Sequence, residues 1–179
     1  SSRPAGACAD EGCAARVKPL RVLTWNVSET GVHPISARAP RDLQVWSGDD
    51  NLAAVQAEVL RLKPDVVALQ ECPSARALDR VGKELDFLGA SRSHCGFVQL
   101  YARRELAARP VELAASVHGV KATVKVGADL VAVAAVHLAP GDAAARRREQ
   151  LHALTAGARV SEETLVVLGD MNVREDEVG

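Results

Sequence analysis

Two polar residues that could do chemistry follow an apolar run near the end of the chain. The run Leu165–Leu168 contains two β-branched valines, which favours a buried β-strand, and Gly169 ends it. Asp170 and Asn172 come directly afterwards. On a strand-like continuation, their spacing places both side chains on the same side, directed at one spot. Polar groups at the carboxyl end of a buried strand are typical of the functional edge of an α/β protein.

Three further polar residues stand at the ends of other strand-like runs. Asn26 follows LRVLTW, Glu71 follows DVVALQ, and His137 lies near the end of LVAVAAVHL. Each has a structural alternative: a turn cap, an exposed charge, and a hydrogen-bonded core histidine, respectively. All five residues lie at or just after the end of a strand-like run, and this shared position favours a common site over five separate structural roles.

The residue types in this set indicate a hard cation rather than zinc or a nucleophilic triad. Carboxylates and carboxamides suit Mg²⁺, which prefers oxygen ligands. The sequence contains no CxxC, HExxH, GxSxG, P-loop or GxGxxG motif. Cys8 and Cys13 could form half of a zinc site, but no second pair follows nearby.

The elements that position these residues predict a mixed α/β fold. Strands are expected at 20–27, 65–70, 96–101, 111–117, 120–126, 130–138 and 165–168, and helices at 51–62, 76–88 and 142–156. Connections at His118–Gly119 and 127–129 predict an antiparallel middle part, whereas the flanking helix–strand units predict parallel pairs. The expected architecture is two packed sheets flanked by helices.

Composition and the two ends of the chain limit the possible domain organisation and class of protein. At 179 residues with 47% hydrophobic content, the chain fits one domain over 20–179, preceded by a linker or disordered arm over 1–19. A net charge of −1 gives no bulk attraction to nucleic acid, and no apolar run approaches the roughly 20 residues of a membrane span. Four scattered cysteines and no visible secretory signal predict an intracellular protein. Both ends look cut.

A resemblance to a known family rests on four short motifs. TWN at 24–26, LQE at 69–71, HL at 137–138 and GDMN at 169–172 resemble, in order and spacing, the motif series of the endonuclease/exonuclease/phosphatase superfamily. The resemblance covers about residues 20–179 and implies a deoxyribonuclease-I-like, four-layer sandwich of two mixed β-sheets. Within the superfamily, the run 137–178 is most similar to the type 2 tyrosyl-DNA phosphodiesterases.

The resemblance also implies a mechanism. Glu71 would bind Mg²⁺, or Mn²⁺ in its place, with Asn26 in the outer shell of the metal near the phosphate. Asp170 would orient or deprotonate the attacking water, and Asn172 would hold the phosphate or the water. His137 would donate to a non-bridging phosphate oxygen. These roles fit in-line phosphodiester hydrolysis without a covalent intermediate.

Two departures separate the chain from the family pattern. The family carries a further Asp-His pair near its C-terminus, so the domain is expected to lack its C-terminal part, and His118 and His152 stand in the wrong places to substitute. After the HL motif, the similar enzymes have a serine and an arginine, whereas 139–142 here ends in Asp142. Arg146 or Arg147 is the expected replacement for the missing positive charge.

The resemblance predicts a metal-dependent hydrolase that acts in DNA repair on a 5′ end carrying a tyrosyl adduct. Such an enzyme would be a monomer in the nucleus or cytoplasm without a membrane partner. Two alternatives remain open. The substrate could be RNA, a phosphoinositide or a sphingolipid, or the chain could be an inactive relative that only binds a phosphorylated partner.

Overall fold

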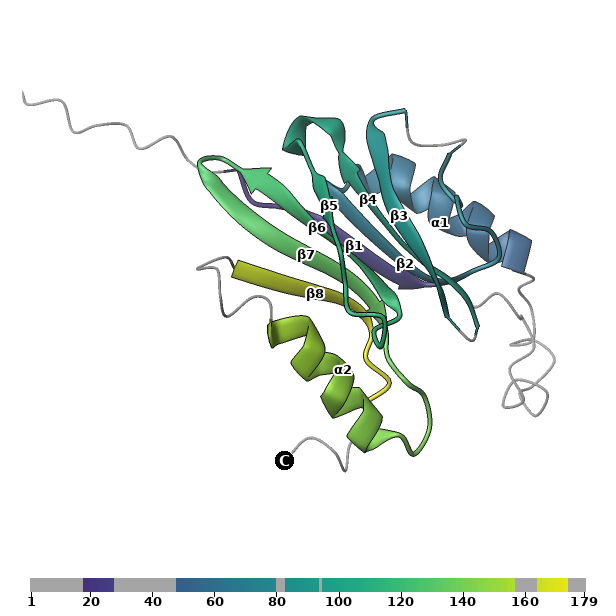
Figure 1. Ribbon diagram of the computed structural model, residues 1–179. Coiled ribbons are helices and arrows are strands. Elements are labelled where there is room, and N and C mark those ends of the chain that lie inside the picture. Colours follow the sequence, from purple (N-terminus) through teal and green to yellow (C-terminus); the bar gives the residue numbers. More distant parts are fainter. Residues whose placement is uncertain (1–17, 28–47, 80–82, 94, 157–163, 174–179) are drawn as a thin grey trace, which may run out of the picture.

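Two four-stranded β-sheets form the centre of the molecule (Figure 1). The computed structural model describes residues 18–27, 48–79, 83–93, 95–156 and 164–173. The first sheet has the order β1-β2-β4-β3, and the second has the order β5-β6-β7-β8. The strands are β1 Val22–Asn26, β2 Val66–Cys72, β3 Leu85–Ser93, β4 Gly96–Arg103, β5 Arg109–Val111, β6 Gly119–Val126, β7 Asp129–His137 and β8 Thr164–Asp170.

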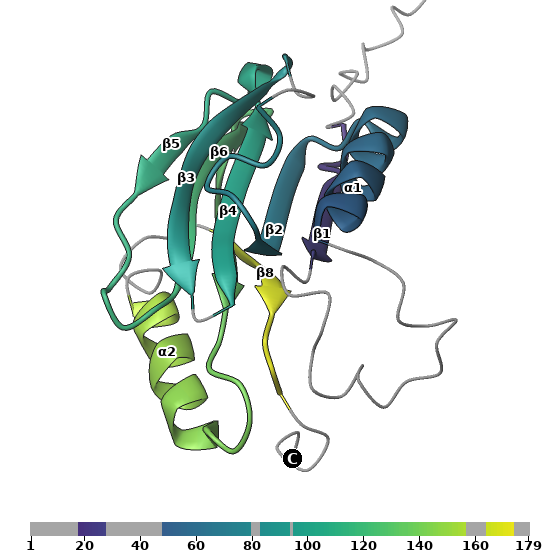
Figure 2. The ribbon, with the colours of Figure 1, turned by 90° about the vertical axis from the view of Figure 1, so that its right-hand side faces the viewer.

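Helices cover the outer faces of the two sheets. Helix α1 (Gly48–Leu62) packs Val55 and Val59 onto the first sheet, and α2 (Ala144–Ala156) packs Leu154 onto the second. Figure 2 shows the two helices on opposite sides of the molecule. Between the sheets, small and branched apolar residues form a buried core that includes Ala68 and Val133. The structure confirms the predicted four-layer sandwich.

The strand pairing is mixed in both sheets. β1 and β2 are parallel, as are β7 and β8, while the strands between them pair in antiparallel fashion. Val126 pairs with Asp129 across a two-residue turn in which Gly127 has a φ of 64°, the left-handed conformation that glycine adopts without strain. The predicted turn at 127–129 and the predicted parallel pairs are confirmed.

The prediction of a helix over 76–88 is wrong for the residues of this range that the structure describes. Residues 75–79 form turns, and β3 begins at Leu85. Leu85 and Leu88 are spaced like a helical face, but on a strand residues three positions apart lie on opposite sides of the sheet: Leu85 packs towards α1 and Leu88 into the core between the sheets. Residues 80–82 of this prediction lie outside the described part of the chain.

Buried side chains replace helical hydrogen bonding in the turn after β2. The Leu78 N–H donates to Tyr101 Oη at 3.2 Å, and the Ala77 N–H donates to Gln99 Oε1 at 2.9 Å. Tyr101 donates in turn to Gln99 at 2.6 Å, and Gln99 Nε2 donates to the Ser74 carbonyl. These backbone groups are satisfied without a helix.

The strand predicted over 111–117 is also wrong. β5 ends at Val111, and Gly119 is the first residue of β6 rather than part of a hairpin turn. A Cβ at Gly119 would lie 2.5 Å from the Ala135 carbonyl oxygen, so this glycine permits close strand pairing instead of a turn. The linker prediction for 1–19 falls largely on residues outside the described part, as do Cys8 and Cys13.

Candidate functional site

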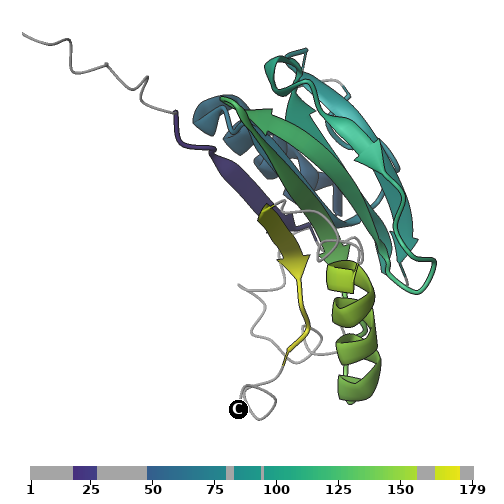
Figure 3. The ribbon, with the colours of Figure 1, turned by 60° about the vertical axis from the view of Figure 1, so that its left-hand side comes forward.

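The carboxyl ends of one parallel strand pair from each sheet meet at one end of the sandwich. Asn26 and Gln70 form the last register pair of β1 and β2, and His137 and Asp170 form the last pair of β7 and β8. β1 and β8 are in contact across the two sheets, and the two strands adjoin one another in Figure 3. The predicted convergence of polar strand ends therefore takes place across the boundary between the sheets.

Glu71 reaches this meeting point through a β-bulge. Gln70 and Glu71 of β2 together stand opposite the single β4 residue Val98. The φ of Glu71 is 53°, a left-handed conformation that costs a non-glycine residue roughly 1–2 kcal/mol. Such strain concentrates at functional sites, where the surrounding structure holds it in place.

Asp170 depends on the glycine that precedes it. Gly169 has a φ of 135°, and a Cβ on it would lie 2.0 Å from the Val136 carbonyl oxygen of the neighbouring strand. Only a residue without a side chain allows β8 to approach β7 this closely. The apolar run, the glycine and the carboxylate thus form one unit that places Asp170 beside His137.

A single amide group connects the two carboxylates. Asn26 Nδ2 donates to Glu71 Oε1 at 3.0 Å and to Asp170 Oδ2 at 3.1 Å. His137 Nε2 lies 3.6 Å from the same Glu71 oxygen and 3.9 Å from the same Asp170 oxygen. Four of the five residues singled out in the sequence therefore contact one another, although the chain separates Asn26 from Asp170 by 144 positions.

Asn172 contributes in a different way from the one its spacing predicted. The chain does not continue as a strand, because β8 ends at Asp170 and Asn172 has a φ of 49°. The Asn172 backbone N–H donates to Asp170 Oδ1 at 2.9 Å, and its Nδ2 donates to the Leu138 carbonyl at 2.9 Å. Asn172 thus closes a turn on Asp170 and links it to the segment that follows His137.

The donor set fits a divalent cation. One ligand atom from each of Glu71, His137 and Asp170 lies within 4.8 Å of the others. Within the described part of the chain, neither carboxylate pairs with a lysine or an arginine. Two neighbouring carboxylates repel one another, and a hard cation with oxygen ligands relieves that repulsion.

Solvent access differs among the three groups. The side chain of His137 is 2% exposed and that of Glu71 is 13% exposed, whereas that of Asp170 is 32% exposed. Asp170 is therefore the group in this cluster that an incoming water molecule or substrate reaches most easily.

Ser93 also belongs to the site, although no sequence pattern identified it as a functional residue. Its hydroxyl lies 3.3 Å from His137 Nδ1, on the opposite side of the imidazole from the carboxylates. Ser93 ends β3, on a different sheet from His137, and no motif or spacing in the sequence connects the two residues. Only the packing of one sheet on the other brings them together.

The two arginines predicted as replacements after the HL motif lie in different environments. Arg147 is 2% exposed and donates from Nη1 to the carbonyl oxygens of Ala139 and Gly141, at 2.7 and 2.8 Å. Its guanidinium therefore holds the loop between β7 and α2. Arg146 and Asp142 are exposed, so of the two arginines predicted as a replacement, Arg146 has its side chain in solvent.

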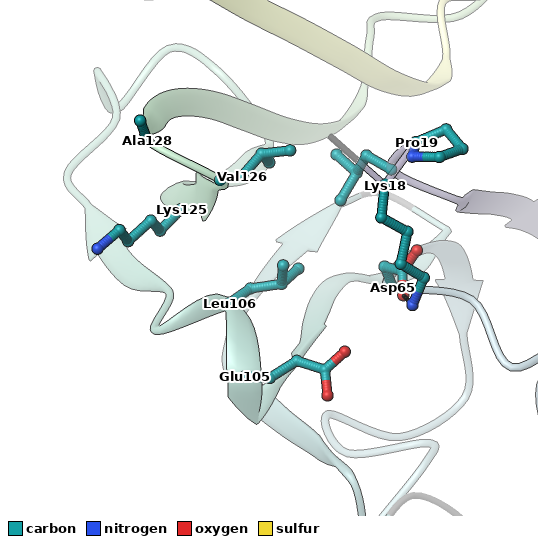
Figure 4. Close-up of a pocket in the computed structure, with 10 residues that line it drawn as sticks. Lys18, Pro19, Asp65, Glu105, Leu106, Lys125, Val126 and Ala128 are labelled. Carbon is teal, nitrogen blue, oxygen red and sulfur yellow. Dashed lines mark ion pairs between the residues drawn. The ribbon is translucent and has the colours of Figure 1, made fainter. Parts of the chain in front are cut away.

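A hollow of about 570 Å³ lies at the other end of the strands (Figure 4). Pro19, Leu20, Leu106 and Val126 give it apolar walls, and Lys18, Asp65, Glu105 and Lys125 bring charges to it. Lys18 reaches Asp65 at 3.8 Å, and Asp65 also pairs with Arg103 at 3.5 Å. This cluster ties the starts of β1 and β2 to the end of β4 and is remote from the candidate site.

No helix in the described residues has both the length and the apolar character that crossing a membrane requires.

Several solved structures share this fold. TDP2 from D. rerio, complexed with a single-strand DNA product, matches with a TM-score of 0.67 at 19% identity, over 89% of this chain and 63% of that one. The human Nocturnin catalytic domain with bound sulfate matches with a TM-score of 0.58 at 19% identity, over 87% and 66%. The endonuclease domain of TRAS1, a telomere-specific non-LTR retrotransposon, matches with a TM-score of 0.56 at 14% identity, over 89% and 63%.

The chain spans less than two thirds of the length of the TDP2 and TRAS1 chains that it matches. No curated protein matches the chain significantly. The model of the Endonuclease/Exonuclease/phosphatase family matches residues 23–179, which includes all five residues singled out at the strand ends. The chain belongs to the Endonuclease/Exonuclease/phosphatase family.

Proposed function

We propose that this protein is a metal-dependent phosphodiesterase that hydrolyses its substrate by in-line attack of water. The observation that carries the proposal is the arrangement around the Asn26 amide, which holds the carboxylates of Glu71 and Asp170 together against His137 Nε2. A buried imidazole, a carboxamide, and two carboxylates that pair with no lysine or arginine among the described residues are groups that phosphoryl chemistry uses.

Glu71 is the residue proposed to hold the cation. It is more enclosed than Asp170, and the bulge fixes its backbone. Asn26 donates to the Glu71 carboxylate and would complete the outer shell of the metal. A bound Mg²⁺, or Mn²⁺, would supply Lewis-acid polarisation of the phosphate and offset the charge of the two carboxylates.

Asp170 is the residue proposed to orient the attacking water and to accept its proton. The Asp170 carboxylate is partly exposed, and two donors hold it: Asn26 Nδ2 on one oxygen and the Asn172 N–H on the other. A general base must be held in a fixed geometry within hydrogen-bond reach of the water that it activates. Asn172 supports this geometry, and its direct contact with the phosphate or the water remains a prediction.

His137 is proposed to donate a hydrogen bond to a non-bridging phosphate oxygen as negative charge builds. Its Nε2 points at the same space as the two carboxylates, and its side chain is buried, so little water competes for the nitrogen. A donor preorganised in this way typically contributes about 10²–10³-fold to turnover.

The proposed substrate is a DNA 5′ end that carries a tyrosyl adduct, which would place the protein in DNA repair, in the nucleus or cytoplasm, as a monomer. The motif similarity over 137–178 supports this substrate, as does the likeness in fold to TDP2 structures, one of which holds a single-strand DNA product. The alternatives, RNA, a phosphoinositide or a sphingolipid, stay in the test because the loop after His137 carries the exposed Asp142 where the similar enzymes have a serine and an arginine.

The test is a hydrolysis assay with four substrates: a 5′-phosphotyrosyl oligonucleotide, a single-stranded RNA, a phosphoinositide and a small generic phosphodiester. Each is incubated with Mg²⁺, with Mn²⁺ and with a chelator, using the unaltered chain and Asp170→Asn. The matched control is Asp129→Asn, which changes a carboxylate at the opposite end of β7.

Turnover that requires the cation and Asp170 but not Asp129 supports the proposal, and the preferred substrate identifies the branch of the family. Turnover that persists with chelator, or in Asp170→Asn, contradicts the mechanism. Saturable binding of a phosphorylated ligand without any turnover indicates the inactive binding module instead.

A further inference from the structure

Ser93 and His137 form a contact between the two sheets that none of the roles above uses. Ser93 is the last residue of β3 in the first sheet, and His137 is the last residue of β7 in the second. Ser93 is 7% exposed and His137 is 1% exposed, so water is largely excluded from both. The Ser93 hydroxyl oxygen lies 3.3 Å from His137 Nδ1.

The hydroxyl has three polar groups within reach but only one proton to donate. The Cys95 N–H donates to Ser93 Oγ at 3.4 Å, which occupies one acceptor position. The Gly96 carbonyl at 3.2 Å can only accept, and His137 Nδ1 can either accept or donate. The direction of the Ser93–His137 hydrogen bond therefore depends on which imidazole nitrogen carries the hydrogen.

The far side of the ring decides that question. His137 Nε2 faces carboxylate oxygens of Glu71 and Asp170, at 3.6 and 3.9 Å. In the site without a cation, the ionised carboxylates only accept hydrogen bonds, so a lone pair on Nε2 would face two negative groups, whereas an N–H would be attracted to them. In the neutral imidazole, a hydrogen on Nε2 leaves Nδ1 as an acceptor, and the Ser93 hydroxyl can then turn its one hydrogen from the Gly96 carbonyl to Nδ1.

We propose that Ser93 is a positioning residue that donates to His137 Nδ1 and so holds the imidazole in its Nε2–H tautomer. The inference rests on the proposed function, in which His137 donates from Nε2 to the phosphate. The opposite tautomer would present a lone pair to an anionic phosphate. Without the Ser93 hydroxyl, the site would keep its other residues, but a fraction of the molecules would lack the Nε2–H donor. The hydroxyl acts through His137 and does not touch the substrate.

The experiment combines ¹⁵N NMR of the imidazole rings with steady-state kinetics on the whole chain. At alkaline pH, where imidazoles are neutral, the ¹⁵N shifts of a histidine report which nitrogen carries the hydrogen. The chain has five histidines, and a His137→Gln variant assigns the resonance of interest. Spectra are recorded in the presence of a chelator for the unaltered chain, for Ser93→Ala, for Ser93→Thr and for Ser91→Ala, a serine on the same strand.

The unaltered chain is expected to show His137 with its hydrogen on Nε2, and Ser93→Ala is expected to show both tautomers. Ser93→Thr retains a hydroxyl and should keep the Nε2–H form, and Ser91→Ala should leave His137 unchanged. Loss of a hydrogen-bond partner behind a functional imidazole typically costs about 10- to 100-fold. We expect that loss in kcat for Ser93→Ala, with little change in KM and with recovery in Ser93→Thr.

A hydrogen on Nδ1 in the unaltered chain overturns the proposal and requires no variant to fold. A single Nε2–H tautomer in a folded Ser93→Ala overturns it as well. The NMR result does not depend on turnover, so a chain without phosphodiesterase activity refutes the proposed function while the role of Ser93 is still decided by the spectra.

Discussion

His137 and Asp170 form the last register pair of the parallel strands β7 and β8, with His137 Nε2 3.9 Å from Asp170 Oδ2. Neighbouring parallel strands end at the same edge of a sheet, so this pairing alone brings an imidazole and a carboxylate together. The first sheet supplies the other half of the site in the same way, through the ends of β1 and β2. The chemistry therefore depends on backbone pairing more than on loops.

Asp170→Asn should lower kcat by about 10²- to 10⁴-fold, the usual contribution of a positioned proton acceptor. The carboxamide keeps the size of the side chain but loses the charge and the basicity. Initial rates with saturating Mg²⁺ measure the effect, and circular dichroism confirms that the variant is folded. Asp129→Asn should retain full activity, and a comparable loss in that control would refute a specific role for Asp170.

Glu71→Gln should weaken the binding of Mg²⁺ or Mn²⁺ by about tenfold or more, since a direct ligand contributes at least as much as the outer-shell partners of a metal. The carboxamide oxygen can still accept from Asn26, so the site should remain assembled. Calorimetric titration with each cation measures the affinity, and excess metal should restore part of the activity. The control Glu105→Gln, at the other end of the strands, should leave metal binding unchanged. If Glu71→Gln and the unaltered chain bind the cation with equal affinity, Glu71 is not a metal ligand.

Gly169→Ala should destabilise the protein by about 3 kcal/mol or more, through backbone strain and overpacking together. The added Cβ would lie 2.0 Å from the Val136 carbonyl oxygen, and the backbone φ of 135° is one that L-residues rarely adopt. Urea unfolding of this variant is compared with that of Gly141→Ala. Gly141 also has a positive φ, 66°, but its Cβ would meet no atom within 4 Å, so about 1 kcal/mol is expected there. Equal losses in both variants would contradict the close approach of β8 to β7.

Alkaline pH should destabilise the protein through Tyr101, because burial raises the pKa of this phenol above its ordinary value of about 10. A folded-state pKa that lies above the unfolded one contributes stability below about pH 10, and this stability is lost as the pH rises further. Tyr101 is the only tyrosine in the sequence, so tyrosinate absorbance reports this residue alone. The ionisation of Tyr101 should coincide with unfolding. Tyr101→Phe should reduce the decline in unfolding free energy between about pH 10 and 12. Ionisation of Tyr101 in a protein that stays folded would show that the phenol is not enclosed.

Sequence patterns predicted the layered fold and most of the site because both depend on local periodicity. Alternating or continuous apolar runs specify buried strands, and the polar residue at the end of each run then lies at a common edge. Asn26, Glu71, His137 and Asp170 followed from that rule, and the structure brings all four into contact.

The errors came from local backbone conformations that apolar spacing alone does not record. Leu85 and Leu88 have a helical spacing but lie on opposite faces of strand β3, and the left-handed turn at Asn172 follows the end of the strand that was expected to continue. Ser93 was missed for a different reason. Its partner His137 lies 44 positions away on another sheet, and contacts between sheets leave no spacing rule in one sequence.

Under the proposed function, the Asn26 amide determines how the protein loses activity on heating. It bridges Glu71 of the first sheet and Asp170 of the second over contacts of 3.0 and 3.1 Å, and each strand pair could stay intact while that bridge opens. Activity therefore measures the alignment of two separate layers rather than the amount of β-structure. An enzyme of this design should become inactive through sliding of the layers at a temperature where its secondary structure is still complete.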